Sequence, residues 1–157
     1  MSKPTVAISW NSSCGGCDES IVDIEKILDV AAQVDFVFWP CAMDFKYKDV
    51  EEMECGSIAV SLINGAIQNS EQERVVRLLR EKSVLVVAFG SCACLGGIPS
   101  LANLTCLSKM YASSYLTSPT LVNHDDIIPA PGHKERDYDL DLPKLFESVH
   151  TLDMIID

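Results

Sequence analysis

Four short apolar runs alternate with polar and amphipathic segments, and this alternation restricts the chain to a small set of folds. The runs cover residues 6–10, 34–39, 57–63 and 84–89. An amphipathic helical pattern follows the first run and is expected to end near Ala32, and a second helix begins at a capping box over residues 70–73. Because strands that alternate with helices form parallel sheets, the sequence predicts an α/β domain with a doubly wound parallel sheet of about four strands.

The fourth run is apolar throughout, so we expect it to be covered on both faces of the sheet. The pattern becomes weaker after Pro99. There we expect a helix over residues 101–111, an irregular exposed arm over 117–139, and a short helical stretch that ends at His150.

Two loops that contain cysteines follow the first and the fourth apolar runs. The first loop holds Cys14 and Cys17 with two glycines between them, and the second holds Cys92 and Cys94. Ligands of doubly wound sheets bind beyond the carboxyl ends of the strands, so we expect both loops at one edge of the sheet. The helix after the first loop directs its positive end at the cysteines, which favours their thiolate forms.

The Cys-x-x-Cys pattern alone is compatible with three roles: a dithiol redox pair, half of a metal site, or two thiols that only pack. The second cysteine loop favours a metal, because thiols from two loops at one edge form a pocket for a soft metal. Such a pocket suits zinc and an iron–sulfur cluster equally well. We expect Cys41 to be an unligated thiol, and Cys55 and Cys106 to pack inside the fold.

The charge balance excludes some classes of partner. The 157 residues carry a formal net charge of −11, which argues against nucleic acid or an anionic membrane as the partner. Seven cysteines cannot all pair within one chain, and the sequence has no recognisable signal peptide and no apolar run near the roughly 20 residues of a membrane span. We therefore expect a reducing, cytoplasmic location and no membrane span.

Several motifs of the chain resemble those of a known family. The sequence around both cysteine loops is similar to the small subunit of nickel–iron hydrogenases and to its relative in respiratory complex I, and other segments are closer still to the small subunit of methyl-viologen-reducing hydrogenases. The first group comprises Trp10, residues 14–17, Glu19, residues 90–93 and residues 96–97, and the second comprises residues 63–66, 78–83 and 101–104. The resemblance extends from about Val6 to Asp157.

The resemblance implies a flavodoxin-like domain over residues 1–157, with three α/β/α layers. It implies a [4Fe–4S] cluster at the sheet edge with Cys14, Cys17 and Cys92 as ligands, and Cys94 as a possible substitute ligand. The chain would then be the electron-transfer subunit of a hydrogenase-type oxidoreductase, not catalytic alone. It would relay electrons between a nickel–iron site on a large subunit and further electron-transfer subunits.

One departure from the family concerns the fourth cluster ligand. In relatives this cysteine lies in a Pro-Gly-Cys-Pro turn after a further strand, whereas this chain has Pro131-Gly132-His133. We expect the final strand and its cysteine to lie beyond Asp157, so that the cluster is absent or incomplete in this 157-residue form. Asn64 also stands where nickel–iron hydrogenases often carry a glutamate.

Two alternatives to the electron-transfer subunit remain open from the sequence. The first is a zinc- or dithiol-based redox module that acts without a large subunit. The second is a non-redox assembly protein that keeps the scaffold without the full ligand set.

Overall fold

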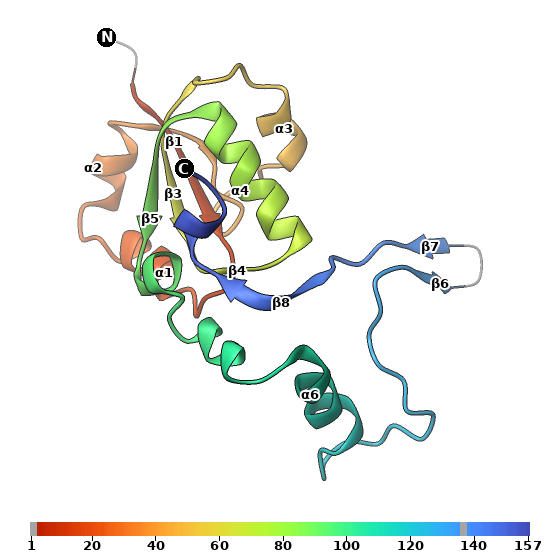
Figure 1. The fold of residues 1–157 in the computed structure, drawn as a ribbon. Coiled ribbons are helices and arrows are strands. Elements are labelled where there is room, and N and C mark those ends of the chain that lie inside the picture. Colours follow the sequence, from red (N-terminus) through yellow and green to blue (C-terminus); the bar gives the residue numbers. More distant parts are fainter. Residues whose placement is uncertain (1–2, 136–137) are drawn as a thin grey trace.

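Four parallel strands form the central sheet of the computed structural model, which describes residues 3–135 and 138–157 (Figure 1). The strands are β1 (Thr5–Trp10), β2 (Asp35–Phe38), β3 (Ile58–Asn64) and β5 (Ser83–Phe89). They lie in the order β2-β1-β3-β5. The predicted α/β class, with a doubly wound parallel sheet of four strands, is therefore confirmed.

The register of the sheet brings three strand ends to the same level. Trp10 at the end of β1 is opposite Asn64 at the end of β3, and Asn64 is opposite Phe89 at the end of β5. The loops that follow these three strands therefore start side by side on the carboxyl edge.

Helices cover both faces of the sheet. They are α1 (Gly16–Val22), α2 (Ile27–Ala31), α3 (Tyr47–Glu51), α4 (Ser70–Lys82) and α5 (Ser91–Leu95). Figure 1 shows α4 on one side of the strands and α1 and α2 on the other. The single helix predicted up to Ala32 is instead two short helices. Leu28 of α2 is 82% exposed, so this apolar side chain does not pack against the sheet.

Side chains of β1 alternate between two apolar clusters, as the period of a strand requires. Ala7 belongs to the cluster beneath α4, with Val76 and Leu79. Val6 and Ile8 point to the opposite face, where they pack with Trp39. The residue before helix α4 is Asn69, whose side chain accepts a hydrogen bond of 2.9 Å from the backbone N–H of Gln72. The N-cap is therefore Asn69, one residue before the predicted start.

Strand β5 lies at the edge of the sheet, and one prediction about it was wrong. Val84 is 69% and Leu85 is 54% exposed, although we expected this apolar run to be covered on both faces. The reason is its position, because nothing in the described chain pairs with its outer side.

The remaining helical elements are η1 (Pro99–Leu104), α6 (Leu107–Tyr111), the π-helical turn η2 (Ala112–Leu116) and η3 (Leu152–Met154). The remaining strands are β4 (Ile67–Asn69), β6 (His133–Glu135), β7 (Tyr138–Leu140) and β8 (Leu145–His150). The helix predicted over 101–111 is thus a 3-10 turn and a separate short helix. Figure 1 shows α6 and the β6–β7 hairpin projecting away from the sheet.

The stretch predicted to be helical up to His150 is strand β8, so that prediction was wrong. β8 pairs antiparallel with β4. The side chain of Asn103 also holds it, since the Asn103 amide donates to the carbonyl oxygen of Val149 (2.9 Å) and accepts from its N–H (2.7 Å). These contacts are long-range, and a local pattern does not reveal them.

Among residues 3–135 and 138–157, no single helix is both long and apolar enough to span a bilayer. The bent pair Ser91–Leu104 and Leu107–Leu116 reaches that length and composition only when the two segments are combined.

Candidate functional site

Backbone hydrogen bonds fix the chain before Cys14 to the neighbouring strand end. The N–H of Asn11 donates to the carbonyl oxygen of Asn64 at 2.8 Å, and Ser12 and Ala66 exchange two backbone hydrogen bonds of 3.0 and 2.9 Å. The Ser12 hydroxyl also bonds the side chain of Gln72 on α4. The first cysteine loop therefore starts from a point held by β3 and α4.

Gly15 begins α1 and lies directly against Trp10. Its φ of 85° is in the left-handed region, where glycine is favoured. A Cβ at this position would be 2.9 Å from Cζ2 of the Trp10 ring. The indole therefore covers the turn between the two cysteines, while half of it stays exposed.

The second cysteine loop touches the first one at Gly90. A Cβ on Gly90 would be 2.2 Å from Sγ of Cys17, a distance that no real side chain permits, so only glycine fits there. In the same way a Cβ on Gly97 would be 2.6 Å from Sγ of Cys92. Both thiols thus lie in hollows that exist because glycine has no side chain.

The four cysteines of the two loops differ in exposure. The other three lie close enough to Cys17 to affect its charge. Cys17 and Cys92 are partly buried, whereas Cys14 and Cys94 are exposed. Burial raises the pKa of Cys17, and the neighbouring groups Cys14, Cys92, Asp18 and Cys94 raise it further, in that order. The Cys94 thiol donates to the carbonyl oxygen of Ala88 at 3.4 Å, so this cysteine already has a partner.

The direction of the Cys17 shift contradicts the prediction that helix α1 favours the thiolate. Cys17 lies in the first turn of this seven-residue helix, and burial and the nearby thiols raise its pKa there. Metal ligation requires the thiolate. Binding at Cys17 must therefore release a proton, and becomes less favourable as the pH falls.

The donor set has the chemistry that an iron–sulfur cluster needs. Within the described ranges, no three His, Cys, Asp or Glu side chains are close enough together to hold one ion. A cluster is larger than an ion, and its ligands are accordingly further apart. Thiol groups from two loops, with two glycines that leave room beside them, supply the ligand type that such clusters use.

The structure also reveals a buried acidic residue in the first turn of α1. Asp18 is 2% exposed. It accepts a hydrogen bond of 3.0 Å from the indole N–H of Trp39 and a second one from the side-chain amide of Asn64. Trp39 directly follows β2 and Asn64 ends β3, and these two strands lie on either side of β1. Their position at strand ends is the one sequence signal that places them near Asp18.

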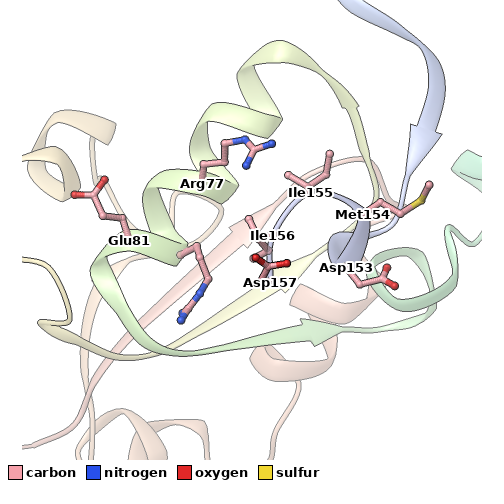
Figure 2. Close-up of a pocket in the computed structure, with 8 residues that line it drawn as sticks. Arg77, Glu81, Asp153, Met154, Ile155, Ile156 and Asp157 are labelled. Atoms are coloured by element: carbon pink, nitrogen blue, oxygen red, sulfur yellow. The ribbon is translucent and has the colours of Figure 1, made fainter.

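Two pockets lie in different parts of the molecule. One, of about 340 Å³, is lined by Trp10, Asp18, Trp39 and Cys41 among others, beside the first cysteine loop. The other, of about 410 Å³, lies between Arg77 of α4 and the last residues of the chain, and no cysteine lines it (Figure 2).

Three other cysteines are on the surface. Cys41 is exposed at the first of these pockets. Cys55 and Cys106 are exposed as well, so the prediction that they pack inside the fold was wrong.

The chain around the second cysteine loop carries no charge. Between Lys82 and Lys109 the sequence has no acidic residue, basic residue or histidine, although the whole chain has a net charge of −11. Large apolar side chains are exposed in this segment; Leu95 is 79%, Ile98 is 72% and Leu104 is 84% exposed. An uncharged apolar surface thus adjoins Cys92.

A doubly wound sheet with thiols at its carboxyl edge agrees with the class that the motifs indicate, the small subunits of nickel–iron hydrogenases. The sequence profile of the family described as NADH ubiquinone oxidoreductase, 20 Kd subunit, matches residues 14–141. The chain belongs to this family.

Curated relatives include hydrogenase subunits. The iron-sulfur subunit of an F420-non-reducing hydrogenase of Archaeoglobus profundus is 41% identical over 146 residues, which are 92% of this chain and 46% of that protein. A subunit of the F420-non-reducing hydrogenase of Methanothermobacter thermautotrophicus is 36% identical over 99% of this chain and 46% of its own length. The chain thus spans about half the length of these relatives.

A solved structure has the same fold. A chain in the crystal structure of an NAD+-reducing [NiFe]-hydrogenase in the H2-reduced state matches with a TM-score of 0.80 and 26% identity, over 99% of this chain and 79% of that one. The predicted membership in the hydrogenase small-subunit family is confirmed, and the chain is related to subunits of oxidoreductases.

Proposed function

We propose that this chain is the electron-transfer subunit of a hydrogenase-type oxidoreductase. It relays electrons between a nickel–iron site on a large subunit and downstream carriers through a [4Fe–4S] cluster. The observation that carries the proposal is the contact between Gly90 and Cys17, which joins the two cysteine loops at one edge of the sheet. The names of the relatives support the same class of function.

Cys14, Cys17 and Cys92 are the proposed ligands. When bound, the cluster accepts and returns one electron at a time without a change in the protein's covalent bonds. The protein's part is to hold the thiols in place through Gly90 and Gly97 and to cover one side of the site with the Trp10 ring. No residue of this chain has a proposed catalytic role.

The fourth ligand is either Cys94 or a cysteine outside these 157 residues. Cys94 lies on the same loop as Cys92 but is engaged with the carbonyl oxygen of Ala88. The relatives are about twice as long, so their remaining half offers further candidates. We propose that residues 1–157 act as one cluster-binding domain, whose final strand and last ligand lie outside this segment.

The large subunit is the proposed partner of the uncharged surface beside Cys92. Burial of exposed apolar side chains such as Leu95 and Ile98 favours association. The absence of charge from residues 83 to 108 avoids the cost of removing ions from water. A partner there would also shorten the path for electrons to the cluster. We further propose a cytoplasmic location, where thiols stay reduced.

The test is reconstitution, with iron and sulfide under anaerobic conditions, of the protein in a form long enough to include the proposed fourth ligand. Iron, acid-labile sulfide and the electron paramagnetic resonance spectrum of the dithionite-reduced sample are measured for the wild type and for Cys92→Ser. Cys55→Ser is the matched control, because Cys55 is an exposed thiol that bonds Glu81 and lies outside both cysteine loops. We expect the cluster signal to be lost in the first variant and kept in the second.

The two alternatives give different results in the same experiment. Zinc without acid-labile sulfide would indicate a zinc redox module. Co-purification with a large subunit that is unaffected by replacement of Cys14, Cys17 and Cys92 together, with no cluster in the wild type, would indicate an assembly protein. Either result would overturn the proposal.

A further inference from the structure

Asp18 is a buried acidic side chain in direct sequence contact with a proposed cluster ligand. It follows Cys17 in the first turn of α1 and is 2% exposed. Acidic side chains are almost never fully buried unless they are paired. None of the ion pairs found among the described residues includes Asp18, so neutral groups and not a cation hold this carboxyl group.

Both carboxyl oxygens of Asp18 accept hydrogen bonds. Oδ1 accepts from Nε1 of Trp39 at 3.0 Å, and Oδ2 accepts from Nδ2 of Asn64. An indole N–H and an amide N–H can only donate, so both carboxyl oxygens act as acceptors in this arrangement. The two donors stabilise the charge in place and do not cancel it.

The two donors come from rigid parts of the molecule. Asn64 ends β3 and is fully buried, and Trp39 comes directly after β2 and is 5% exposed. A charge that is fixed beneath the surface is screened by water and salt far less than a charge on an exposed side chain. Its effect on a neighbouring group is therefore larger.

The sign of that effect follows from the position of Asp18 next to Cys17 in α1, since negative charges near one another repel. The pKa of Cys17 agrees with it. After burial and the thiols of Cys14 and Cys92, Asp18 is the next cause that raises this pKa. The carboxylate thus opposes negative charge on the Cys17 sulfur. Addition of an electron to a group bound at that sulfur is opposed for the same reason.

We propose that Asp18 lowers the reduction potential of the cluster bound at Cys17 and is a positioning residue for the first cysteine loop. The inference rests on the proposed function. It adds the residue that sets part of the reduction potential of the cluster. In each redox cycle one electron enters the cluster from the reductant and leaves to an oxidant, and Asp18 neither gains nor loses a bond.

The first test is the midpoint potential of Asp18→Asn, measured on the reconstituted protein by a mediated titration with dithionite and followed by electron paramagnetic resonance. Asparagine keeps the size of the side chain and removes the charge. The Asn64 amide can turn to accept from it, because its Oδ1 has no partner among the described residues.

We expect Asp18→Asn to raise the potential, so that the ratio of reduced to oxidised cluster at a fixed applied potential increases about tenfold, which is about 59 mV for one electron. Glu19→Gln is the matched control. It removes the same charge one residue later from an exposed side chain, and its shift should be much smaller. Equal shifts, or no shift in either variant with full iron content, would overturn the inference.

A second variant covers the case in which Asp18→Asn fails to bind the cluster. Trp39→Phe keeps the carboxylate and removes one of its two donors, so the charge is less compensated and the potential should fall. A rise in Trp39→Phe would overturn the inference. If the wild type itself takes up no iron and sulfide, the proposed function fails and this inference fails with it, whereas equal potentials at full iron content refute the inference alone.

Discussion

Gly90 and Cys17 touch across the carboxyl edge of the sheet: a Cβ on Gly90 would be 2.2 Å from the Cys17 sulfur. The two residues belong to loops that follow β5 and β1, and β3 lies between these strands. Their contact therefore depends on the whole sheet being assembled. Because of this contact, even a methyl group added at Gly90 would collide with the sulfur of a proposed ligand.

The first prediction concerns this contact. Gly90→Ala should abolish cluster binding, because the new methyl group and the Cys17 sulfur cannot occupy the same space. Iron and sulfide content after reconstitution measures the loss. Gly56→Ala is the control, since Gly56 also has a positive φ, of 72° against 86° for Gly90, but a Cβ there meets nothing within 4 Å. Equal cluster content in the two variants would show that the contact is not important.

The second prediction concerns the hold of η1 on β8. Asn103→Ala removes both hydrogen bonds to the backbone of Val149, which is 9% exposed. The free energy of unfolding should fall by about 1–3 kcal/mol, measured by urea denaturation. Asn123→Ala should cost less, because Asn123 bonds only within its own exposed loop, to Tyr115 and Ile127. An equal loss in both variants would contradict the role assigned to Asn103.

The third prediction concerns the core beneath α4. Leu79 is fully buried, and Leu79→Ala should reduce the free energy of unfolding by about 2–5 kcal/mol. Leu28→Ala makes the same chemical change on an 82% exposed side chain and should change it by no more than about 0.5 kcal/mol. Thermal or urea unfolding of the two variants separates these values. A large decrease in the free energy of unfolding of Leu28→Ala would contradict the exposed position of Leu28 in α2.

The fourth prediction concerns the pH dependence of two exposed thiols. A hydrogen bond from the Ser108 hydroxyl, together with the backbone at Lys109, lowers the pKa of Cys106. The Glu81 carboxylate, through its hydrogen bond with the thiol, raises the pKa of Cys55. At neutral pH a larger fraction of Cys106 is thiolate, so iodoacetamide should modify it faster than Cys55.

The difference between these two thiols should shrink as the pH rises, since both thiols become ionised at high pH. Mass spectrometry of timed samples measures the two rates. Ser108→Ala should slow the reaction of Cys106 and leave that of Cys55 unchanged. Faster modification of Cys55 at neutral pH would contradict the assignment of the two hydrogen bonds.

Local patterns were sufficient to predict the parallel sheet. The runs that became β1, β3 and β5 are apolar and bounded by clear turn signals, and their alternation with helices fixes the strand direction. The strand at 145–150 was missed because its partners, β4 and Asn103, are distant in sequence. A short segment with a mixed pattern takes the structure that its neighbours impose on it.

The site shows the same division. The cysteine loops were recognisable, because glycines beside cysteines after a strand form a local pattern. The role of Asp18 was not recognisable, since it depends on where Trp39 and Asn64 lie in three dimensions. The thiolate prediction for Cys17 failed for a related reason. It considered the helix dipole and omitted the burial that the folded chain produces.

The order of the strands has a consequence for biosynthesis. Cys14 and Cys17 leave the ribosome early, but Cys92 comes after β5, and β5 takes its place only by pairing with β3. Iron offered to the growing polypeptide would therefore find only two of the three proposed ligands until that pairing is complete. If the chain holds the proposed cluster, delivery of the iron must therefore follow folding, and the iron donor acts after translation rather than during it.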